Sequence, residues 1–280
     1  MKKNEWDNEE NANIEIQLLL EAIFQKYGYD FRNYSTNHLT RRITYILNKT
    51  NSQNISELQH KVLYDVKTFY ELLKTLSINV TEMFRDPSFY KSIREEVVPV
   101  LKTYPFIKVW SAGCSTGEEV YSLAILLKEE GLLDRSLIYG TDLNEDVLMK
   151  AREGIYSAKV LENYANNYED AGGKGELKDY FTLKYNSILV KEELKKHIVF
   201  AGHNLVTDHV FGEMNLIICR NVFIYFDQEL QDRTVKLFLE SLCTGGFLGI
   251  GAKEDIRFSK HYHLFDVVND RYKIYQKKFI

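Results

Sequence analysis

Two acidic residues directly follow a pair of glycines in residues 107–122, which read I-K-V-W-S-A-G-C-S-T-G-E-E-V-Y-S. A short apolar run ends at Gly113, and Gly117 leads straight into Glu118 and Glu119. Carboxylates at this position would repel a phosphate group and attract a cation. We therefore expect this stretch to bind a ligand that carries a positive charge.

The elements around these glycines read as a strand, a tight loop and a helix. The apolar residues 106–111 predict the strand, and the helical spacing of apolar residues predicts a helix over 117–130, with Gly131 at its end. Such a helix begins at the carboxyl end of a parallel strand, where its free N–H groups attract polar ligands. The glycine spacing alone is common in ordinary turns, so it needs further support.

A carboxylate at the end of the next strand gives that support. Residues 136–141 predict a strand that closes on Asp142, and residues 144–152 predict the following helix. An acid at this place holds the two ribose hydroxyls of a nucleotide in doubly wound folds. A ribose together with a positive charge indicates S-adenosylmethionine, and the two glutamates argue against NAD.

Four blocks of sequence together resemble the CheR-type methyltransferases, which use S-adenosylmethionine to methyl-esterify glutamates of bacterial chemoreceptors. These blocks are S-I-N-V-T-E-M-F-R-D at 77–86, W-S-A-G-C-S-T-G-E-E-V-Y-S at 110–122, G-T-D-L-N at 140–144 and I-I-C-R-N-V-F-I-Y-F at 217–226. The first and last blocks are rarely met outside this family. The resemblance extends from about residue 18 to residue 258.

The resemblance implies an α/β chain with two domains. Residues 1–85 would form an N-terminal helical bundle and linker, and residues 86–280 a Rossmann-like class I methyltransferase domain. A small antiparallel β subdomain would be inserted at 154–197. The pattern of residues 14–76 agrees, because apolar residues recur there at helical spacing and proline is absent. Residues 1 to about 12 are polar, and we expect them to be frayed.

The rest of the chain predicts further parts of the sheet. We expect strands at 198–201, 214–219 and 247–251, a helix at 228–242, a turn at Gly245 and Gly246, and a final hairpin pair at 265–268 and 272–275. In the insertion we expect strands at 180–185 and 187–190, and a mobile surface loop over the polar residues 163–176. Some family members dock a receptor peptide at this subdomain. The acidic loop here departs from their pattern, so the sequence does not decide whether this chain docks such a peptide.

Composition allows a cytoplasmic enzyme. The net charge of −4 gives no argument for nucleic acid or a membrane surface, and no apolar run is long enough for a membrane span. The start of the chain lacks a signal-peptide core, and Cys114, Cys219 and Cys243 are expected as reduced thiols. We expect a monomer. We expect no metal, because no cysteine or carboxylate completes a set of metal ligands with His261 and His263 at suitable spacing.

The resemblance also implies site residues. Gly113 and either Glu118 or Glu119 would hold the methionine end of the cofactor, Asp142 its ribose, and the residues after the third strand tip its adenine. The expected cofactor-binding set is Asn79, Thr81, Arg85, Gly113, Glu118, Glu119, Asp142, Asn204, Leu205, Arg220 and Asn221, and the expected catalytic residues are Arg85 and Tyr225. From the residues alone, Thr81 or Asp86 could instead cap a helix, and Tyr225 could be a core residue.

We therefore expect a protein-glutamate O-methyltransferase that acts on the cytoplasmic helices of methyl-accepting chemoreceptors and yields S-adenosylhomocysteine. The alternatives are a non-receptor protein as acceptor, or a module that senses S-adenosylmethionine without turnover. In residues 30–74 basic residues outnumber acidic ones, around Arg41 and Arg42. They form either a solvated helix face or a patch for an acidic partner.

Overall fold

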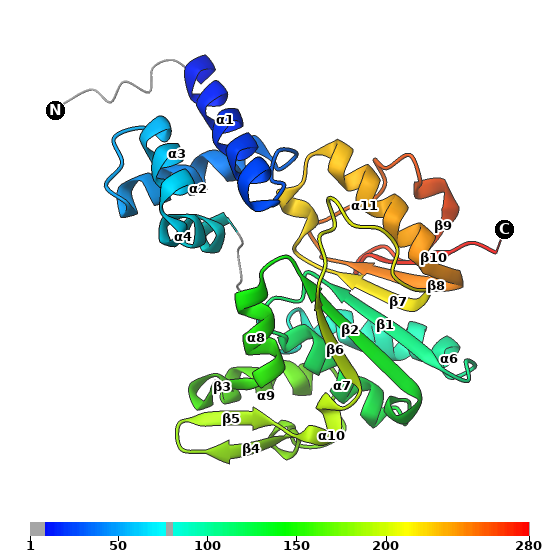
Figure 1. The fold of residues 1–280 in the computed structure, drawn as a ribbon. Coiled ribbons are helices and arrows are strands. Elements are labelled where there is room, and N and C mark those ends of the chain that lie inside the picture. Colours follow the sequence, from blue (N-terminus) through cyan, green and yellow to red (C-terminus); the bar gives the residue numbers. More distant parts are fainter. Residues whose placement is uncertain (1–8, 77–80, 280) are drawn as a thin grey trace. The chain divides into compact units, whose positions relative to one another are not determined.

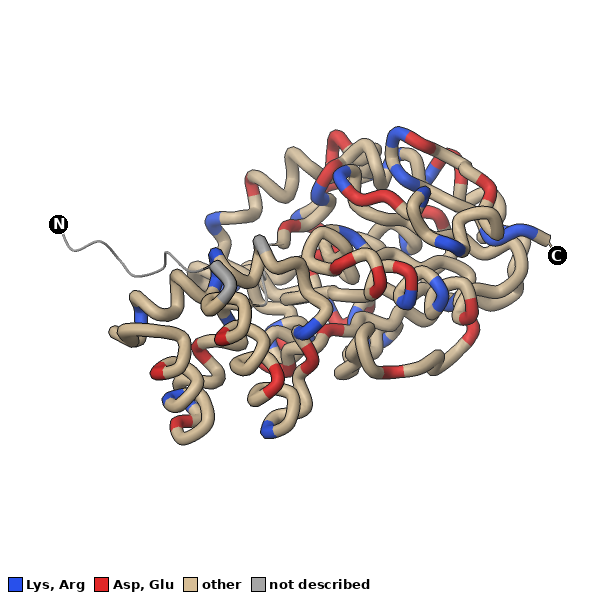
Figure 2. The backbone as a smooth tube through the Cα atoms, turned by 90° about the horizontal axis from the view of Figure 1, so that it is seen from above, with Lys and Arg blue, Asp and Glu red and all other residues tan. Residues whose placement is uncertain are grey.

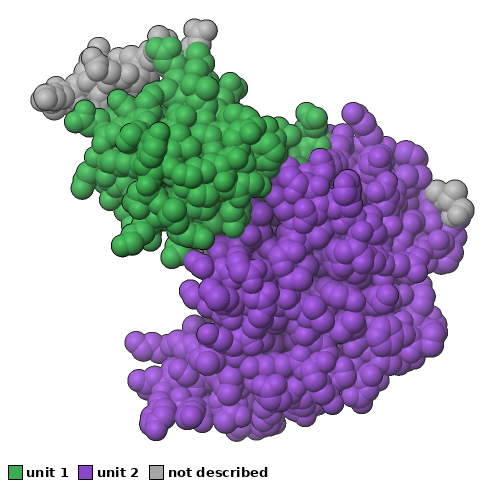
Figure 3. All heavy atoms as spheres, in the orientation of Figure 1, with its two compact units in different colours: residues 1–78, 225–230 green, residues 79–224, 231–280 purple. Residues whose placement is uncertain are grey.

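The computed structural model describes residues 9–76 and 81–279, in two compact units. One unit contains residues 1–78 together with 225–230, and the other contains residues 79–224 and 231–280 (Figure 3). Residues 79–85, which we expected with the helical domain, fall in the second unit. Within the described residues, no helix has both the length and the apolar character needed to cross a bilayer.

The first unit is a bundle of four helices, as expected. They are α1 (Glu9–Tyr27), α2 (Thr36–Lys49), α3 (Ile55–Tyr64) and α4 (Val66–Leu76). Apolar side chains at helical spacing point inward and are buried, among them Leu19, Ile23, Ile43, Ile46, Leu58, Val62 and Leu72. Because α1 already begins at Glu9, the expectation of frayed chain is wrong for residues 9–12; residues 1–8 lie outside the described part.

A short segment from far along the chain, Tyr225–Leu230, folds with this helical unit. The Ser35 N–H donates to the Tyr225 carbonyl at 2.8 Å, and the Asp227 N–H donates to the Asn33 carbonyl at 3.0 Å. Between these two bonds, the rings of Tyr34 and Phe226 meet edge to face, 5.3 Å apart. The helical unit is therefore built from two separate pieces of sequence.

The second unit contains a seven-stranded sheet in the order β6-β2-β1-β7-β8-β10-β9 (Figure 1). Its first five strands are parallel, and β10 runs antiparallel to both of its neighbours. The strands are β1 (Ile107–Ala112), β2 (Ser136–Asp142), β6 (Ile198–Gly202), β7 (Met214–Cys219), β8 (Leu242–Ile250), β9 (Phe265–Asn269) and β10 (Ile274–Lys277). Since β1 pairs with both β2 and β7, the strand order reverses beside β1, and such a switch point is where doubly wound sheets bind ligands.

Helices connect the strands of this sheet and precede it. They are α5 (Pro87–Ser92), the π-helical turn η1 (Ile93–Val97), α6 (Val98–Leu101), α7 (Glu118–Glu129), η2 (Leu133–Arg135), α8 (Glu145–Glu153), α10 (Glu192–Lys195), η5 (Phe223–Tyr225), α11 (Gln228–Ser241) and η6 (Tyr262–Leu264). Strand β8 departs from expectation: it runs through Gly245 and Gly246, where we expected a turn. The positive φ of Gly245 and a register shift opposite Met214 mark a bulge that keeps this strand paired.

The insertion forms the expected small antiparallel sheet, in the order β3-β5-β4. Its strands are β3 (Ile155–Ser157), β4 (Phe181–Lys184) and β5 (Ser187–Val190), with η3 (Ala158–Val160), α9 (Leu161–Asp170) and η4 (Leu177–Tyr180) between the first two. The expected mobile loop at 163–176 is wrong, because α9 covers most of it. Tyr164 and Tyr168, four residues apart, give this polar helix one buried face.

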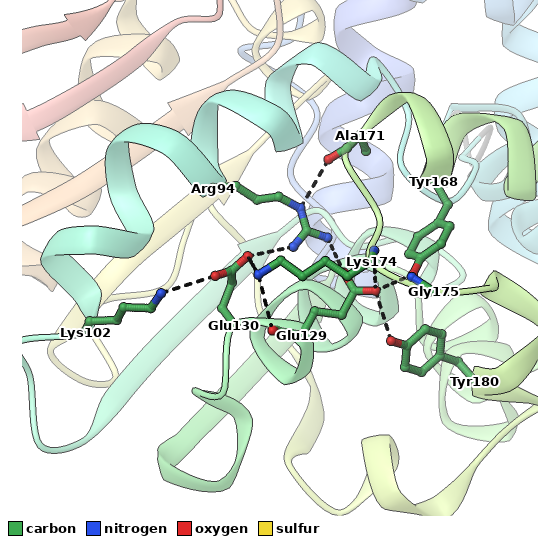
Figure 4. A network of polar contacts seen from close by, with 9 residues as sticks. All are labelled: Arg94, Lys102, Glu129, Glu130, Tyr168, Ala171, Lys174, Gly175 and Tyr180. Atoms are coloured by element: carbon green, nitrogen blue, oxygen red, sulfur yellow. Dashed lines mark hydrogen bonds and ion pairs between the residues drawn. The ribbon is translucent and has the colours of Figure 1, made fainter.

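A nearly buried ion network ties the insertion to the main sheet (Figure 4). Arg94 of η1 forms ion pairs with Glu129 and Glu130 at the end of α7. The exposed fraction is 8% for the side chains of Arg94 and Glu130 and 4% for that of Glu129. The Arg94 Nε also donates to the Ala171 carbonyl at 3.2 Å. Burial acts to raise the pKa of Glu130, but the cations around it outweigh burial and lower it. The network therefore fixes the end of α9 against α7.

We predict that Arg94→Ala lowers the free energy of unfolding by about 3–5 kcal/mol, because it leaves two buried carboxylates without their shared cation. Lys102→Ala is the matched control, since Lys102 contacts the same Glu130 but half of its side chain is exposed; it should cost about 0–1 kcal/mol. Denaturant unfolding measures both. Equal losses in the two variants would contradict the prediction.

Candidate cofactor-binding site

The loop between β1 and α7 approaches its neighbours closely at its two glycines. Gly113 and Gly117 have φ angles of +78° and +93°, a region that side chains disfavour. A Cβ atom on Gly113 would lie 2.5 Å from Val222, and one on Gly117 would lie 2.9 Å from the Ala151 Cβ. The N–H groups of Gly113 and Cys114 both donate to the Thr141 carbonyl at 2.8 Å. The loop is therefore held against the carboxyl ends of β2 and β7.

Asp142, the last residue of β2, organises the start of this site. Its Oδ2 accepts the Ser115 N–H at 2.9 Å, and its Oδ1 accepts the Asn144 N–H at 3.0 Å. Burial raises the pKa of Asp142, and these N–H groups oppose the rise by stabilising the carboxylate. Each oxygen keeps a further lone pair. Asp142 can therefore accept two ligand hydroxyls while it holds the loop.

The two adjacent glutamates face different surroundings. Glu119 accepts a hydrogen bond from Ser111 at 2.8 Å and lies 3.5 Å from an Arg220 nitrogen. Burial raises the pKa of Glu119, and the Arg220 cation opposes this. The structure thus gives Glu119 a cationic partner of its own.

Glu118 is only 5% exposed and is bound by hydroxyl groups. Thr116 donates to one of its oxygens at 2.6 Å, and Tyr164 donates to the other at 3.4 Å. Burial raises the pKa of Glu118 to about 6. No cation among the described residues forms an ion pair with it. Glu118 is therefore suited to receive an ammonium group from a ligand.

Three buried polar atoms around these loops have no hydrogen-bond partner among the described residues. They are the Ser115 Oγ after β1, the Asn144 Nδ2 after β2 and the Arg220 Nε after β7. Buried polar groups normally find partners, and an unpaired one calls for an explanation. A polar ligand at the carboxyl edge of β1, β2 and β7 would supply it. The residues present therefore fit a small molecule with hydroxyl, amino and carboxylate groups.

Arg220 joins the strand edge to the segment that precedes α5. It forms an ion pair with Asp86, and its guanidinium carbon lies 4.4 Å from the centre of the Phe89 ring. Asp86 occupies the position before α5, but its side chain caps no helix N–H. The capping alternative is therefore wrong for Asp86. Arg85, next to it, is half-buried, and its charge helps to lower the pKa of Glu119 against the effect of burial.

Glu254 is a buried residue outside the expected set of site residues. Its Oε2 accepts the N–H groups of Asn221 at 2.9 Å and Gly251 at 2.6 Å, and its Oε1 accepts the Ile224 N–H at 3.3 Å. Burial raises the pKa of Glu254, and these N–H groups oppose the rise. Asn221, with a φ of +62°, is thereby held in a left-handed conformation.

The remaining expected residues lie at several places. Asn204 and Leu205 follow β6. The preceding residue, His203, donates its N–H to the Asp142 carbonyl at 3.2 Å, so Asn204 and Leu205 lie near the carboxyl end of β2. The Asn204 side chain accepts the Val206 N–H at 2.9 Å. Thr81 is half-buried and precedes α5, and Asn79 lies outside the described residues. Tyr225 belongs to the helical unit, where its ring centre lies 5.3 Å from that of His38.

We predict that Glu254→Gln lowers the free energy of unfolding by about 1–3 kcal/mol, because an amide cannot accept hydrogen bonds at both of its polar atoms. Lys253→Gln, at the exposed neighbouring position, is the control and should leave stability unchanged. Thermal or denaturant unfolding measures the difference. A Glu254→Gln variant as stable as the control would show that these N–H groups do not depend on the carboxylate.

Comparison with known proteins agrees with this geometry. Residues 79–274 match the family model described as CheR methyltransferase, SAM binding domain, and residues 14–77 match the CheR methyltransferase, all-alpha domain. A protein of Pseudomonas putida that is named methyltransferase Cher3 is 49% identical over 270 residues, which cover 96% of this chain and 99% of that protein.

Two further relatives carry the name chemotaxis protein methyltransferase. The protein of Listeria innocua is 31% identical, covering 86% of this chain and 90% of its own length. The protein of Borreliella burgdorferi is 30% identical, covering 92% of this chain and 95% of its own. The cofactor is therefore S-adenosylmethionine, the product S-adenosylhomocysteine, and the chain belongs to the CheR methyltransferase family.

Proposed function

We propose that this methyltransferase esterifies glutamate side chains of methyl-accepting chemoreceptors. The observation that carries this proposal is the half-buried Arg85 beside the paired charges of Glu119 and Arg220, at the edge of the cofactor loops. An arginine at this place can bind an incoming carboxylate in two parallel hydrogen bonds. The names of the Listeria and Borreliella relatives support chemotaxis as the setting.

We propose roles for the cofactor-binding residues from the family resemblance and, where the structure describes them, from their surroundings. S-adenosylmethionine supplies an activated methyl group on a positively charged sulfur. Glu118 holds the ammonium of its methionine end, and Asp142 accepts its two ribose hydroxyls. Asn204 and Leu205 border the adenine, while Arg220 and Asn221 line the pocket at the end of β7. Thr81 and Asn79 precede Arg85 and are assigned to the same pocket.

The acceptor needs no general base, because a free glutamate has a pKa of about 4.3 and is ionised at neutral pH. Methyl transfer to it neutralises two opposite charges, so exclusion of water favours the reaction. The work of the protein is then to place the two reactants in line, which can contribute about 7–11 kcal/mol in model systems. Arg85 orients the carboxylate, and Tyr225 is proposed to pack beside the reacting sulfur. A very tight ion pair would weaken the nucleophile, so Arg85 steers the acceptor and does not clamp it.

The proposed partner is an acidic helix of a chemoreceptor in the cytoplasm. Basic and acidic residues are interspersed along the backbone (Figure 2), so recognition would depend on a local surface and not on the overall charge. On α2, Arg41 is exposed and Arg42 is half-buried. We propose this pair as the contact for the acceptor helix.

The test of this function is a transfer assay with methyl-labelled S-adenosylmethionine and the cytoplasmic fragment of a chemoreceptor. We expect base-labile label on the receptor, and its loss when the methylated glutamates are replaced by alanine. Absence of label while calorimetry shows bound cofactor would overturn the receptor as acceptor. The next candidates would then be another protein substrate or a sensor without turnover.

The pKa of Glu118 predicts how cofactor binding depends on pH. The ammonium of the ligand prefers the ionised carboxylate, so affinity should fall as pH drops through the folded-state pKa of about 6. We expect about a tenfold loss at pH 5, one unit below that pKa. Calorimetry with S-adenosylhomocysteine between pH 5 and 7.5 measures this. Glu118→Gln should bind weakly with little of this dependence, and a full dependence in that variant would assign it to another group.

We predict that Arg85→Ala lowers turnover by about a hundredfold, because a misplaced acceptor loses in-line geometry. Cofactor affinity should fall by less. Steady-state kinetics with a receptor fragment and calorimetry measure the two effects. Arg257→Ala, an exposed arginine that pairs with Asp255, is the control. Turnover of Arg85→Ala at the level of the control would show that the acceptor carboxylate is held elsewhere.

A further inference from the structure

Helix α9 of the inserted subdomain lies against the start of α7, next to the loop that joins β1 to α7. Tyr164 is 4% exposed, and its hydroxyl donates to the Glu118 Oε1 at 3.4 Å. A second tyrosine of the insertion, Tyr156 on β3, donates to the Thr116 carbonyl at 2.8 Å. Thr116 in turn donates to the other oxygen of Glu118. The insertion therefore supports both oxygens of this carboxylate, one directly and one through Thr116.

The same helix also binds the segment before α5. The Asn163 Nδ2 donates to Glu82 at 2.8 Å, and the Asn167 Nδ2 donates to the Met83 carbonyl at 3.1 Å. The rings of Tyr168 and Phe84 meet edge to face, 5.3 Å apart. The residue that follows is Arg85. One helix thus contacts the cofactor side of the site and the segment that carries the acceptor-side arginine.

The far end of α9 is fixed by the buried ion network around Arg94. Tyr168 donates to Glu129, and the Arg94 Nε donates to the carbonyl of Ala171, directly after the helix (Figure 4). Tyr180 of η4 also donates to Glu129, at 3.0 Å. The helix is therefore anchored beyond Tyr164, so its contacts with the site are held in place.

We propose that α9 is a positioning element of the methyl-transfer site, with Tyr164 orienting Glu118 toward the cofactor ammonium and Asn167 holding the segment of Arg85. This inference rests on the proposed roles of Glu118 and Arg85. It gives the insertion a function inside the catalytic unit. The signal in the sequence was the spacing of Tyr164 and Tyr168 within a stretch that otherwise looks like a loop.

The Tyr164 hydroxyl also affects the charge of Glu118. Burial raises the pKa of Glu118, while the hydrogen bonds from Thr116 and Tyr164 lower it by stabilising the carboxylate. The other titratable groups that face Glu118 are Tyr156, Tyr121 and Cys114, and burial raises the pKa of each of these, so they are neutral near pH 7. Loss of the Tyr164 hydroxyl should therefore make Glu118 harder to ionise.

The first experiment measures S-adenosylhomocysteine affinity of Tyr164→Phe by calorimetry between pH 5 and 8. We expect about a three- to tenfold loss of affinity at pH 6, and a midpoint of the pH dependence that lies higher than in the wild type. Tyr185→Phe is the matched control, because it removes the hydroxyl of an exposed tyrosine of the same insertion that has no contact with Glu118. It should leave both the affinity and the midpoint unchanged. A wild-type midpoint in Tyr164→Phe would overturn the role of Tyr164.

The second experiment compares kinetics of Asn167→Ala with a receptor fragment. We expect turnover to fall several-fold and S-adenosylhomocysteine affinity to fall by less, since Asn167 contacts the segment that carries Arg85. Unchanged turnover would overturn this half of the proposal.

The outcomes also separate this proposal from the function on which it rests. If Glu118→Gln keeps the full pH dependence, the assignment of Glu118 fails. If Glu118→Gln loses that dependence and Tyr164→Phe matches the wild type, only the positioning role fails.

Discussion

The site depends on buried carboxylates that accept backbone N–H groups at the ends of strands. Loops at the carboxyl edge of a parallel sheet leave N–H groups without strand partners, and burial makes such groups costly. The Asp142 carboxylate accepts the N–H groups of Ser115 and Asn144. The Glu254 carboxylate accepts those of Asn221, Gly251 and Ile224. Each carboxylate therefore fixes the shape of two loops at once. The cost of burying these negative charges is offset by the N–H groups that they bind.

Much of this arrangement could be predicted from local patterns. The bounds of β7 and β5 agree with those expected from the sequence. The bounds of β1 and α7 differ from expectation by one residue at each end, because apolar periodicity and glycine position are local signals. The choice of partner for each charged side chain is not a local signal. Which glutamate pairs with Arg220 depends on how β7 lies beside β1, and only the folded sheet decides that.

The insertion shows where composition misleads. Residues 163–176 are polar and rich in asparagine and glycine, which is typical of a surface loop. Tyr164 and Tyr168 nevertheless bury their rings, and Asn163 and Asn167 use their side-chain amides to bind other segments. A helix can thus be polar in composition and still be a structural partner, if its polar groups have specific acceptors.

The segment Tyr225–Leu230 has a consequence for how the chain folds as it is made. Synthesis proceeds from the amino terminus, so α1 to α4 emerge first. The helical unit, however, includes backbone partners for Asn33 and Ser35 that lie at Asp227 and Tyr225. Four of the seven strands of the main sheet, β1, β2, β6 and β7, precede that segment in the chain, and β8, β9 and β10 follow it. The amino-terminal unit therefore reaches its final set of backbone hydrogen bonds only after most of the catalytic unit has left the ribosome.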